Sequence, residues 1–199
     1  MATIGLSQPF FAIYANNGST VTYSNGGVLG KYTEMSLDLD DAGADNILYA
    51  DNAPAESDTA SFAGGTLTIS TDDLRPEVAE TILGLVSEAI TATGITTTDP
   101  TWLVSNDNQA IPYLGVGGII KKVIGGATKY VGFVLDKVKF SMPSKSVTTQ
   151  GETIEWQVPE LTAQIFRSDK ATHDWYRETS LMDSEADAAA AVKAYLSIT

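Results

Sequence analysis

The stretch IPYLGVGGIIKKVI (residues 111–124), followed by Gly125-Gly126 and TKYVGFVLDKVKFSM (residues 128–142), predicts a long β-hairpin. Two consecutive glycines between strand-forming runs are a strong signal for a tight hairpin turn. Strands in globular proteins usually have about 3–10 residues, and both arms are longer. Because a compact core does not cover so long a ribbon, we expect its excess to pair with another subunit, a membrane or a closed sheet.

Two further segments predict strands with one solvated and one apolar face. Residues 21–39 indicate a strand, a turn at residues 24–27 and a second strand, and residues 65–73 indicate another strand. Polar and apolar side chains alternate in these runs with a period of two, as in a half-buried sheet. The residues expected on the solvated face are Glu34, Ser36, Asp38, Thr66, Thr68 and Ser70.

The segment between those strands, residues 40–64, is long for a connection in a compact domain, and such loops usually carry a function or are disordered. We expect it to protrude as an acidic loop. Its acidic residues are Asp40, Asp41, Asp45, Asp51, Glu56 and Asp58.

The remaining elements complete a mainly β domain with flanking helices, spanning residues 1–199. Residues 1–20 are expected to form an irregular arm. Residues 74–91 predict an amphipathic helix, because apolar side chains recur every four residues and Asp72 or Asp73 can cap its start. The apolar parity changes at residues 158–160, which predicts a bulge or bend. Residues 183–196, capped by Asp183, predict an alanine-rich C-terminal helix.

Composition restricts the possible functions. The net charge is −13, and residues 1–100 contain only Lys31 and Arg75 against 14 acidic residues. The negative electrostatic field of such a chain repels phosphate and disfavours direct binding of DNA or RNA. Cysteine is absent, which excludes disulfides and thiolate chemistry. The start lacks a basic signal-peptide region, and no apolar run reaches the roughly 18 residues of a transmembrane helix. We therefore expect a soluble product, made inside the cell, with no membrane partner and no cofactor.

Three chemical motifs are weak. The carboxylates from Asp38 to Asp41 suggest a calcium loop, but Ala42 and Tyr49 occupy two positions where an EF-hand needs oxygen ligands. The glycines of residues 115–118 are better explained by close backbone approach in a strand than by dinucleotide binding. His173, the only histidine, has Asp174 beside it but no nucleophile placed by sequence. We expect no catalytic, cofactor or metal site.

Six lysines make the hairpin region the only basic part of the chain. Nucleic-acid contact is one interpretation of this cluster. The alternative is that the lysines blunt exposed strand positions or pair with acidic groups of a neighbouring copy, and the overall charge favours it. The residues are Lys121, Lys122, Lys129, Lys137, Lys139 and Lys145.

The run from IPYLGVGGIIKK through GATKYVGFVLDKVKF to VTTQGETIEWQVPELTAQIFR resembles the major tail proteins of long-tailed bacteriophages, the subunits of the tail tube. The opening GLSQPFFAIY, the ILYADNAPAESD loop with the following GGTLTIS strand, and the terminal DSEADAAAAVKAYL are similar too. The likeness covers most of the chain and contains no catalytic signature.

This resemblance implies a β-sandwich flanked by a helix, whose long hairpins join a ring-wide β-barrel in a hexamer. Stacked rings would form a conduit for DNA ejection in the virion tail, with non-contractile tails favoured. The acidic loop would contact the next ring. The partners implied are further copies of the chain, the tape measure, tail-terminator and distal tail proteins, and viral DNA in transit without specific binding. Synthesis would take place in the cytoplasm of the bacterial host.

Two rival hypotheses come from other functional classes. A monomeric β-sandwich could bind a carbohydrate or host-surface ligand through Trp102, Trp175 and Tyr176. A hydrolase could use Asp38, Asp40 or Asp41, although neighbouring carboxylates on one loop fix no geometry for a substrate. If the tube hypothesis is correct, the polar residues on the solvated face line the channel, and the hairpin lysines lie outside it or pair with acids.

Overall fold

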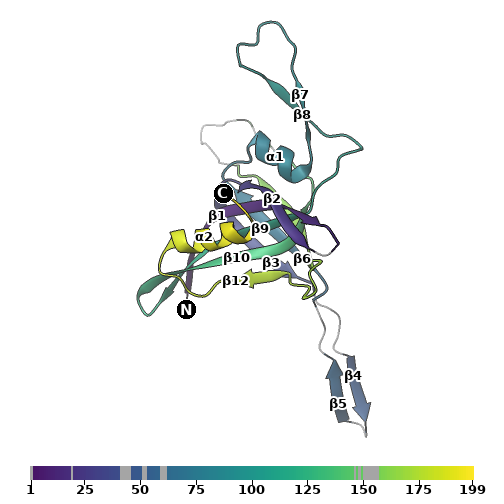
Figure 1. The fold of residues 1–199 in the computed structure, drawn as a ribbon, viewed down its shortest axis with the longest axis vertical. Helices are drawn as coiled ribbons and strands as arrows, with labels where there is room; N and C mark the ends of the chain where they lie inside the picture. The colour runs from purple at the N-terminus through teal and green to yellow at the C-terminus, as the bar shows by residue number, and fades with distance from the viewer. Residues whose placement is uncertain are drawn as a thin grey trace.

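The computed structural model (Figure 1) describes residues 2–18, 20–40, 46–50, 53–58, 62–145, 147, 149 and 157–199, with backbone alone for residues 46–50 and 53–58. The fold is mainly β with two flanking helices, as predicted. One antiparallel sheet has the strand order β2-β1-β9-β10-β11-β6-β3, and β12 pairs with β10. Its strands are β1 Ala2–Asn16, β2 Val21–Val28, β3 Tyr32–Leu39, β6 Gly65–Thr71, β9 Leu114–Ile124, β10 Ala127–Phe140, β11 Glu160–Phe166 and β12 Tyr176–Glu178.

The predicted long hairpin is confirmed in β9 and β10. Gly125 and Gly126 have φ values of 57° and 83°, so the turn uses the left-handed backbone that glycine adopts without strain. The expectation that this ribbon needs an external partner is wrong for most of its length. β1 pairs with β9 from Ala2↔Val123 to Ile13↔Leu114, and β11 and β12 pair with β10.

The predicted irregular arm of residues 1–20 is therefore wrong, because 15 of its residues form β1. Two register shifts, between Thr3 and Gly5 and between Ser7 and Phe10, interrupt the alternation that would have revealed the strand. Beyond them Phe11 packs into one core cluster and Phe10 into another. Both faces of β1 are thus buried at that point.

The predicted turn at residues 24–27 is also wrong. β2 continues through Gly26 and Gly27 to Val28 and pairs with β1, whereas β3 pairs with β6. The two glycines serve packing: a Cβ on Gly26 would meet Ile198 at 2.4 Å, and one on Gly27 would meet the Phe11 ring at 3.2 Å.

The two helices cover different parts of the curved sheet. α1 (Pro76–Leu83) buries Ile82 and Leu83 in the larger core, together with Leu67, Ile69 and other side chains of the sheet. α2 (Glu185–Tyr195) lies on β1, β9 and β10 (Figure 1) and buries Val192. The predicted C-terminal helix is confirmed, but Ser184 caps it, with its Oγ accepting a hydrogen bond from the Asp187 N–H at 3.1 Å.

The prediction of a helix at residues 74–91 is wrong for its second half. The helix ends at Gly84, whose φ of 63° makes it a left-handed C-cap. The chain then forms a two-stranded ribbon, in which β7 (Val86–Ala89) pairs with β8 (Thr101–Val104). Val86 satisfied the helical period of four, but it lies in a strand.

Two ribbons project from opposite ends of the body in Figure 1. The β7–β8 ribbon lies at the end that carries α1. The second ribbon consists of β4 (Asn46–Ala50) and β5 (Ala53–Asp58), within the segment predicted to protrude. The molecule thus has a packed centre and two thin extensions.

Candidate functional site

The six residues predicted for the solvated face lie side by side on β3 and β6. The pairs Glu34↔Ser70, Ser36↔Thr68 and Asp38↔Thr66 are directly opposite in the register. All six side chains are exposed or half-buried, whereas the alternating residues Leu67 and Ile69 on β6 are fully buried. Period-two alternation therefore located this polar face correctly.

β11 extends the polar face by one strand, which sequence reasoning did not identify. Glu160 pairs with Ser70, Thr162 with Thr68 and Gln164 with Thr66. The parity signal was present, because Leu161, Ala163 and Ile165 are the buried residues of this strand. The sequence did not show that β11 pairs with β6. The polar face is a grid of nine side chains: Glu34, Ser36, Asp38, Thr66, Thr68, Ser70, Glu160, Thr162 and Gln164.

The polar face is anionic and rich in hydroxyl groups. It contains three carboxylates, and strands β3, β6 and β11 contain no lysine or arginine. Ser36 Oγ donates to Asp38 Oδ2 at 3.1 Å, and Gln164 Nε2 lies 3.5 Å from Thr66 Oγ1. Such a surface holds water and offers phosphate groups no cation. The nearest lysine in the register is Lys139 of β10, opposite Gln164.

Among the described residues, β2 and β3 are edge strands of the sheet. β3 and β2 end the strand order, and no strand in the described part of the chain pairs with either outer edge. Leu39, at the end of β3, is 50% exposed. An exposed edge presents unpaired backbone N–H and C=O groups that can pair with another chain.

Three of the hairpin lysines are ion-paired within the chain. Lys137 lies 2.7 Å from Asp169, and Lys122 lies 3.9 Å from Glu178. Lys129 pairs with Asp183. Hydrogen bonding from Lys137 holds the pKa of the Asp169 carboxyl below its ordinary value. Three of the six lysines are thus neutralised within the chain, whereas Lys139, which lies beside the polar face, has no carboxylate partner among the described residues.

A polar network lies beneath α2, centred on Asp136, which is fully buried. Arg177 donates to both of its carboxylate oxygens, at 3.2 and 2.9 Å, and the Tyr195 hydroxyl donates at 2.7 Å. The Tyr23 hydroxyl donates to the Asp136 carbonyl oxygen at 3.0 Å. Every charge-bearing group of this network has a partner, as in a buried polar network that stabilises the fold.

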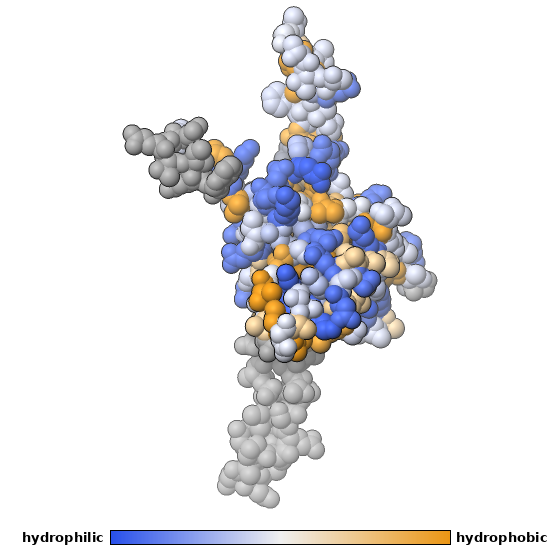
Figure 2. Space-filling model, turned by 90° about the vertical axis from the view of Figure 1, so that its left-hand side faces the viewer, coloured by the Kyte–Doolittle hydropathy of each residue, from blue (hydrophilic) through white to orange (hydrophobic). Residues whose placement is uncertain are grey.

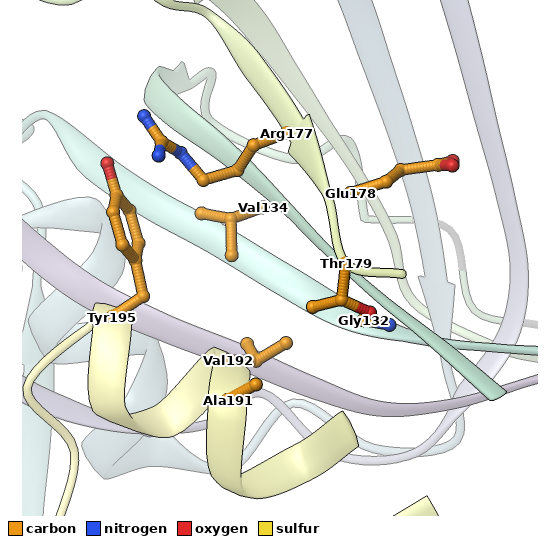
Figure 3. A pocket seen from close by; sticks show the side chains of 8 residues that line it. All are labelled: Gly132, Val134, Arg177, Glu178, Thr179, Ala191, Val192 and Tyr195. Carbon is orange, nitrogen blue, oxygen red and sulfur yellow. Dashed lines mark hydrogen bonds between the residues drawn. The ribbon is translucent and has the colours of Figure 1, made fainter. Parts of the chain in front are cut away.

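A cavity of about 150 Å³ borders this network between β10, β12 and α2. Figure 3 shows apolar side chains such as Val134 and Val192 on its floor and Arg177 and Glu178 above them. The guanidinium of Arg177 is occupied by Asp136 and Asp174. The cavity thus presents no converging set of free polar groups.

His173 has a positive φ of 51°, and its Nδ1 lies 3.2 Å from the Ser168 carbonyl oxygen. The neighbouring Asp174 carboxylate binds Arg177 instead of orienting the imidazole. Among the described residues, no three His, Asp or Glu side chains gather as ligands for a metal ion.

The three aromatic residues of the carbohydrate-binding hypothesis do not form one platform. Trp175 stacks on Phe62, with ring centres 4.4 Å apart, and both Trp175 and Tyr176 pack against the larger core. Trp102 lies on β8 of the projecting ribbon and is 62% exposed.

The acidic loop is described only in part. Asp40 donates its backbone N–H to the Gly64 carbonyl at 3.1 Å, which closes the base of the loop. Asp41, Asp45 and Asp51 lie outside the described residues. Glu56 and Asp58 belong to β5, where the backbone alone is described. Most of the residues on which the hydrolase and calcium-loop hypotheses depend belong to this segment.

No protein-family model matches the chain, and no curated protein matches it significantly. Neither helix that the structure describes is long and apolar enough to cross a membrane.

Proposed function

We propose that this protein is a structural subunit that assembles into stacked hexameric rings and forms the tail tube of a long-tailed bacteriophage. The observation that carries this proposal is the polar face: nine hydroxyl, amide and carboxylate side chains in register on three adjacent strands, without a cation. As the wall of a channel, this face keeps a layer of water and repels the DNA backbone. Moving DNA then makes no lysine–phosphate contact that would slow it.

The open edges supply the means of assembly. The β9–β10 hairpin is covered by the chain's own strands, so pairing between copies falls to the outer edges of β3 and β2, with which no described strand pairs. Strands of neighbouring copies that pair along these edges would carry the polar face around a ring and remove the exposed edges. The projecting acidic segment would contact the next ring. The tape measure, tail-terminator and distal tail proteins are the further partners in this proposal.

The test is assembly of the purified, concentrated protein, followed by light scattering and negative-stain microscopy on one sample. We expect rings or tubes with a central channel. A protein that stays monomeric at the highest attainable concentration contradicts the proposal, because a binding module would behave in that way.

A charged substitution at the edge strand β3 distinguishes edge pairing from other contacts between copies. Leu39→Lys places an ammonium group on the edge strand, which should reduce assembly while the circular dichroism spectrum stays unchanged. Leu181→Lys is the matched control, because Leu181 is 46% exposed and lies outside every strand. Equal assembly of both variants would rule out β3 as the joining edge.

A further inference from the structure

The β7–β8 arm, residues 86–104, is a thin ribbon with hydrophobic side chains on its surface. Figure 2 shows the arm rising clear of the body, with orange hydrophobic groups among pale ones. The register places Val86 opposite Val104 and Glu88 opposite Trp102, so these four residues share one face of the ribbon. Val86 is 46% exposed and Trp102 is 62% exposed.

A ribbon of this kind is a weak structure by itself. Two-stranded hairpins without a covering layer are marginally stable in water. At the base of the arm the backbone is closely packed, because a Cβ on Gly84 would meet the Ala110 carbonyl oxygen at 2.3 Å. At the distal end of the two strands, Ile90 N–H donates to the Pro100 carbonyl at 2.9 Å. The arm is thus held in an extended position with its apolar face uncovered by any described element.

A second surface on the same chain has complementary chemistry. The rings of Tyr113 and Phe166 meet edge to face, with centres 5.5 Å apart, and each residue is 38% exposed. Lys137 and Lys139 place their ammonium groups 4.6 and 5.4 Å from the centre of the Tyr113 ring. These four residues form the Tyr113 patch, which is aromatic and basic.

The charges of the two surfaces are opposite. No lysine or arginine occurs from residue 76 to residue 120, and Glu88 sits beside Trp102 on the arm's apolar face. Lys137 is neutralised by Asp169, but among the described residues Lys139 has no carboxylate partner. The patch thus combines an exposed aromatic surface with an unneutralised cation, and the arm combines an exposed indole with a carboxylate.

We propose that the β7–β8 arm of one copy docks on the Tyr113 patch of a second copy. Trp102 packs against Tyr113 and Phe166, and Glu88 pairs with Lys139. This inference rests on the proposed assembly and assigns one of its contacts. The arm and the patch are different surfaces, so the contact is heterologous, and each copy can both give an arm and receive one.

The absence of cysteine in the chain allows a direct test by disulfide trapping. The variants Trp102→Cys and Phe166→Cys are prepared separately, one with a size tag, then mixed at high concentration and oxidised. We expect a tagged–untagged covalent dimer on non-reducing gels, which only contact between copies can produce. The matched control mixes Trp102→Cys with Thr128→Cys, an exposed position at the far end of the hairpin.

Equal trapping at both positions, or no trapping with Phe166→Cys, overturns the docking inference. If the wild-type protein forms tubes and the trap still fails, only the docking inference falls. If the protein neither assembles nor crosslinks, the proposed function falls with it.

Charge reversal tests the Glu88–Lys139 pair separately. Glu88→Lys and Lys139→Glu should each weaken association by about tenfold, because each brings like charges together. The double variant restores the opposite pairing and should recover most of the loss. If the two losses add in the double variant, the pairing is refuted. Circular dichroism of each variant confirms that the fold is intact.

Discussion

At the scale of single residues, Asp136 joins three segments that are distant in sequence. Its side chain, on β10, binds Arg177 on β12 and Tyr195 on α2. The carboxylate is fully buried, so its charge is tolerated only because cations and hydroxyl groups surround it. The sequence did not reveal this site, because an acidic residue within a strand looks like any solvated position until its neighbours are known.

Asp136→Asn should destabilise the fold by about 3 kcal/mol, because it leaves the buried side of Arg177 without its counter-charge. Urea denaturation measures this loss. The control is Asp174→Asn, which removes a contact with the same guanidinium but at a carboxylate 38% exposed to solvent. Its cost should stay below about 1 kcal/mol. Equal losses would show that burial does not decide the effect.

Tyrosines give the protein a defined response to alkali. Burial raises the pKa of Tyr14 from its ordinary 10.0 to about 12. Burial also raises the pKa values of Tyr23, Tyr32, Tyr176 and Tyr195. The unfolded chain ionises first, so this part of the stability is complete below about pH 10 and is lost as the pH rises toward the folded-state values.

We therefore expect the tyrosinate absorbance of these five residues to rise in one cooperative step, together with unfolding measured by circular dichroism. Gradual ionisation of these tyrosines near pH 10, in a protein that stays folded, would contradict the burial described above.

At the scale of elements, two glycines set the distance between α2 and the sheet. A Cβ on Gly117 would meet Val192 of α2 at 2.8 Å, and a Cβ on Gly132 would meet the same side chain at 2.7 Å. The sequence interpretation of residues 115–118 as a place of close backbone approach is confirmed at Gly117, where the Phe133 carbonyl oxygen would lie 2.7 Å from a Cβ, whereas Gly115 and Gly118 face side chains. Glycine weakens a strand locally, and here close packing with α2 explains why glycine occupies these positions.

Gly132→Ala should cost about 1–3 kcal/mol through overpacking, measured by thermal or urea unfolding. Adding Val192→Ala removes the side chain that the new methyl group would meet, so the double variant should lose less than the sum of the two single losses. Gly5→Ala is the control, since its nearest contact would be an ordinary 3.6 Å from Lys121 Cβ. A similar loss for Gly5→Ala would argue against the packing explanation.

Sequence patterns predicted elements whose signal is local and missed those decided by distant contacts. The β9–β10 hairpin and α2 carry their own turn or cap residues and were found. β1 was missed because bulges break its alternation, and α1 was predicted too long because the apolar period of four continues past Gly84. In each case the missing information was a packing partner: β9 for the first, and Ala110 at the base of the arm for the second.

At the scale of the whole molecule, the polar face and the open edges belong to one curved sheet with a covered opposite side. The face was predicted from alternation in residues 21–39 and 65–73, but its third strand was not, since pairing of β11 with β6 joins segments about 90 residues apart.

Lysines on the polar face should convert an anionic passage that repels DNA into one that binds it. Ser36 and Thr68 lie opposite each other, so Ser36→Lys with Thr68→Lys adds two adjacent cations to each copy. Assembled tubes of this variant should retain DNA at low salt and release it as salt rises. Filter binding or co-sedimentation measures this retention. The control pair is Ser36→Asn with Thr68→Asn, which should retain no more DNA than the wild type. If lysine-bearing tubes fail to hold DNA at any salt concentration, this face does not line the passage.

The position of β1 has a consequence for how the protein is made. β1 is synthesised before its partner strand β9, and its Phe10 and Tyr14 share a core cluster with α2, which is synthesised later still. The apolar side chains of β1 therefore stay exposed until α2 has been synthesised. A nascent chain that has not yet reached α2 cannot bury these side chains as the finished fold does.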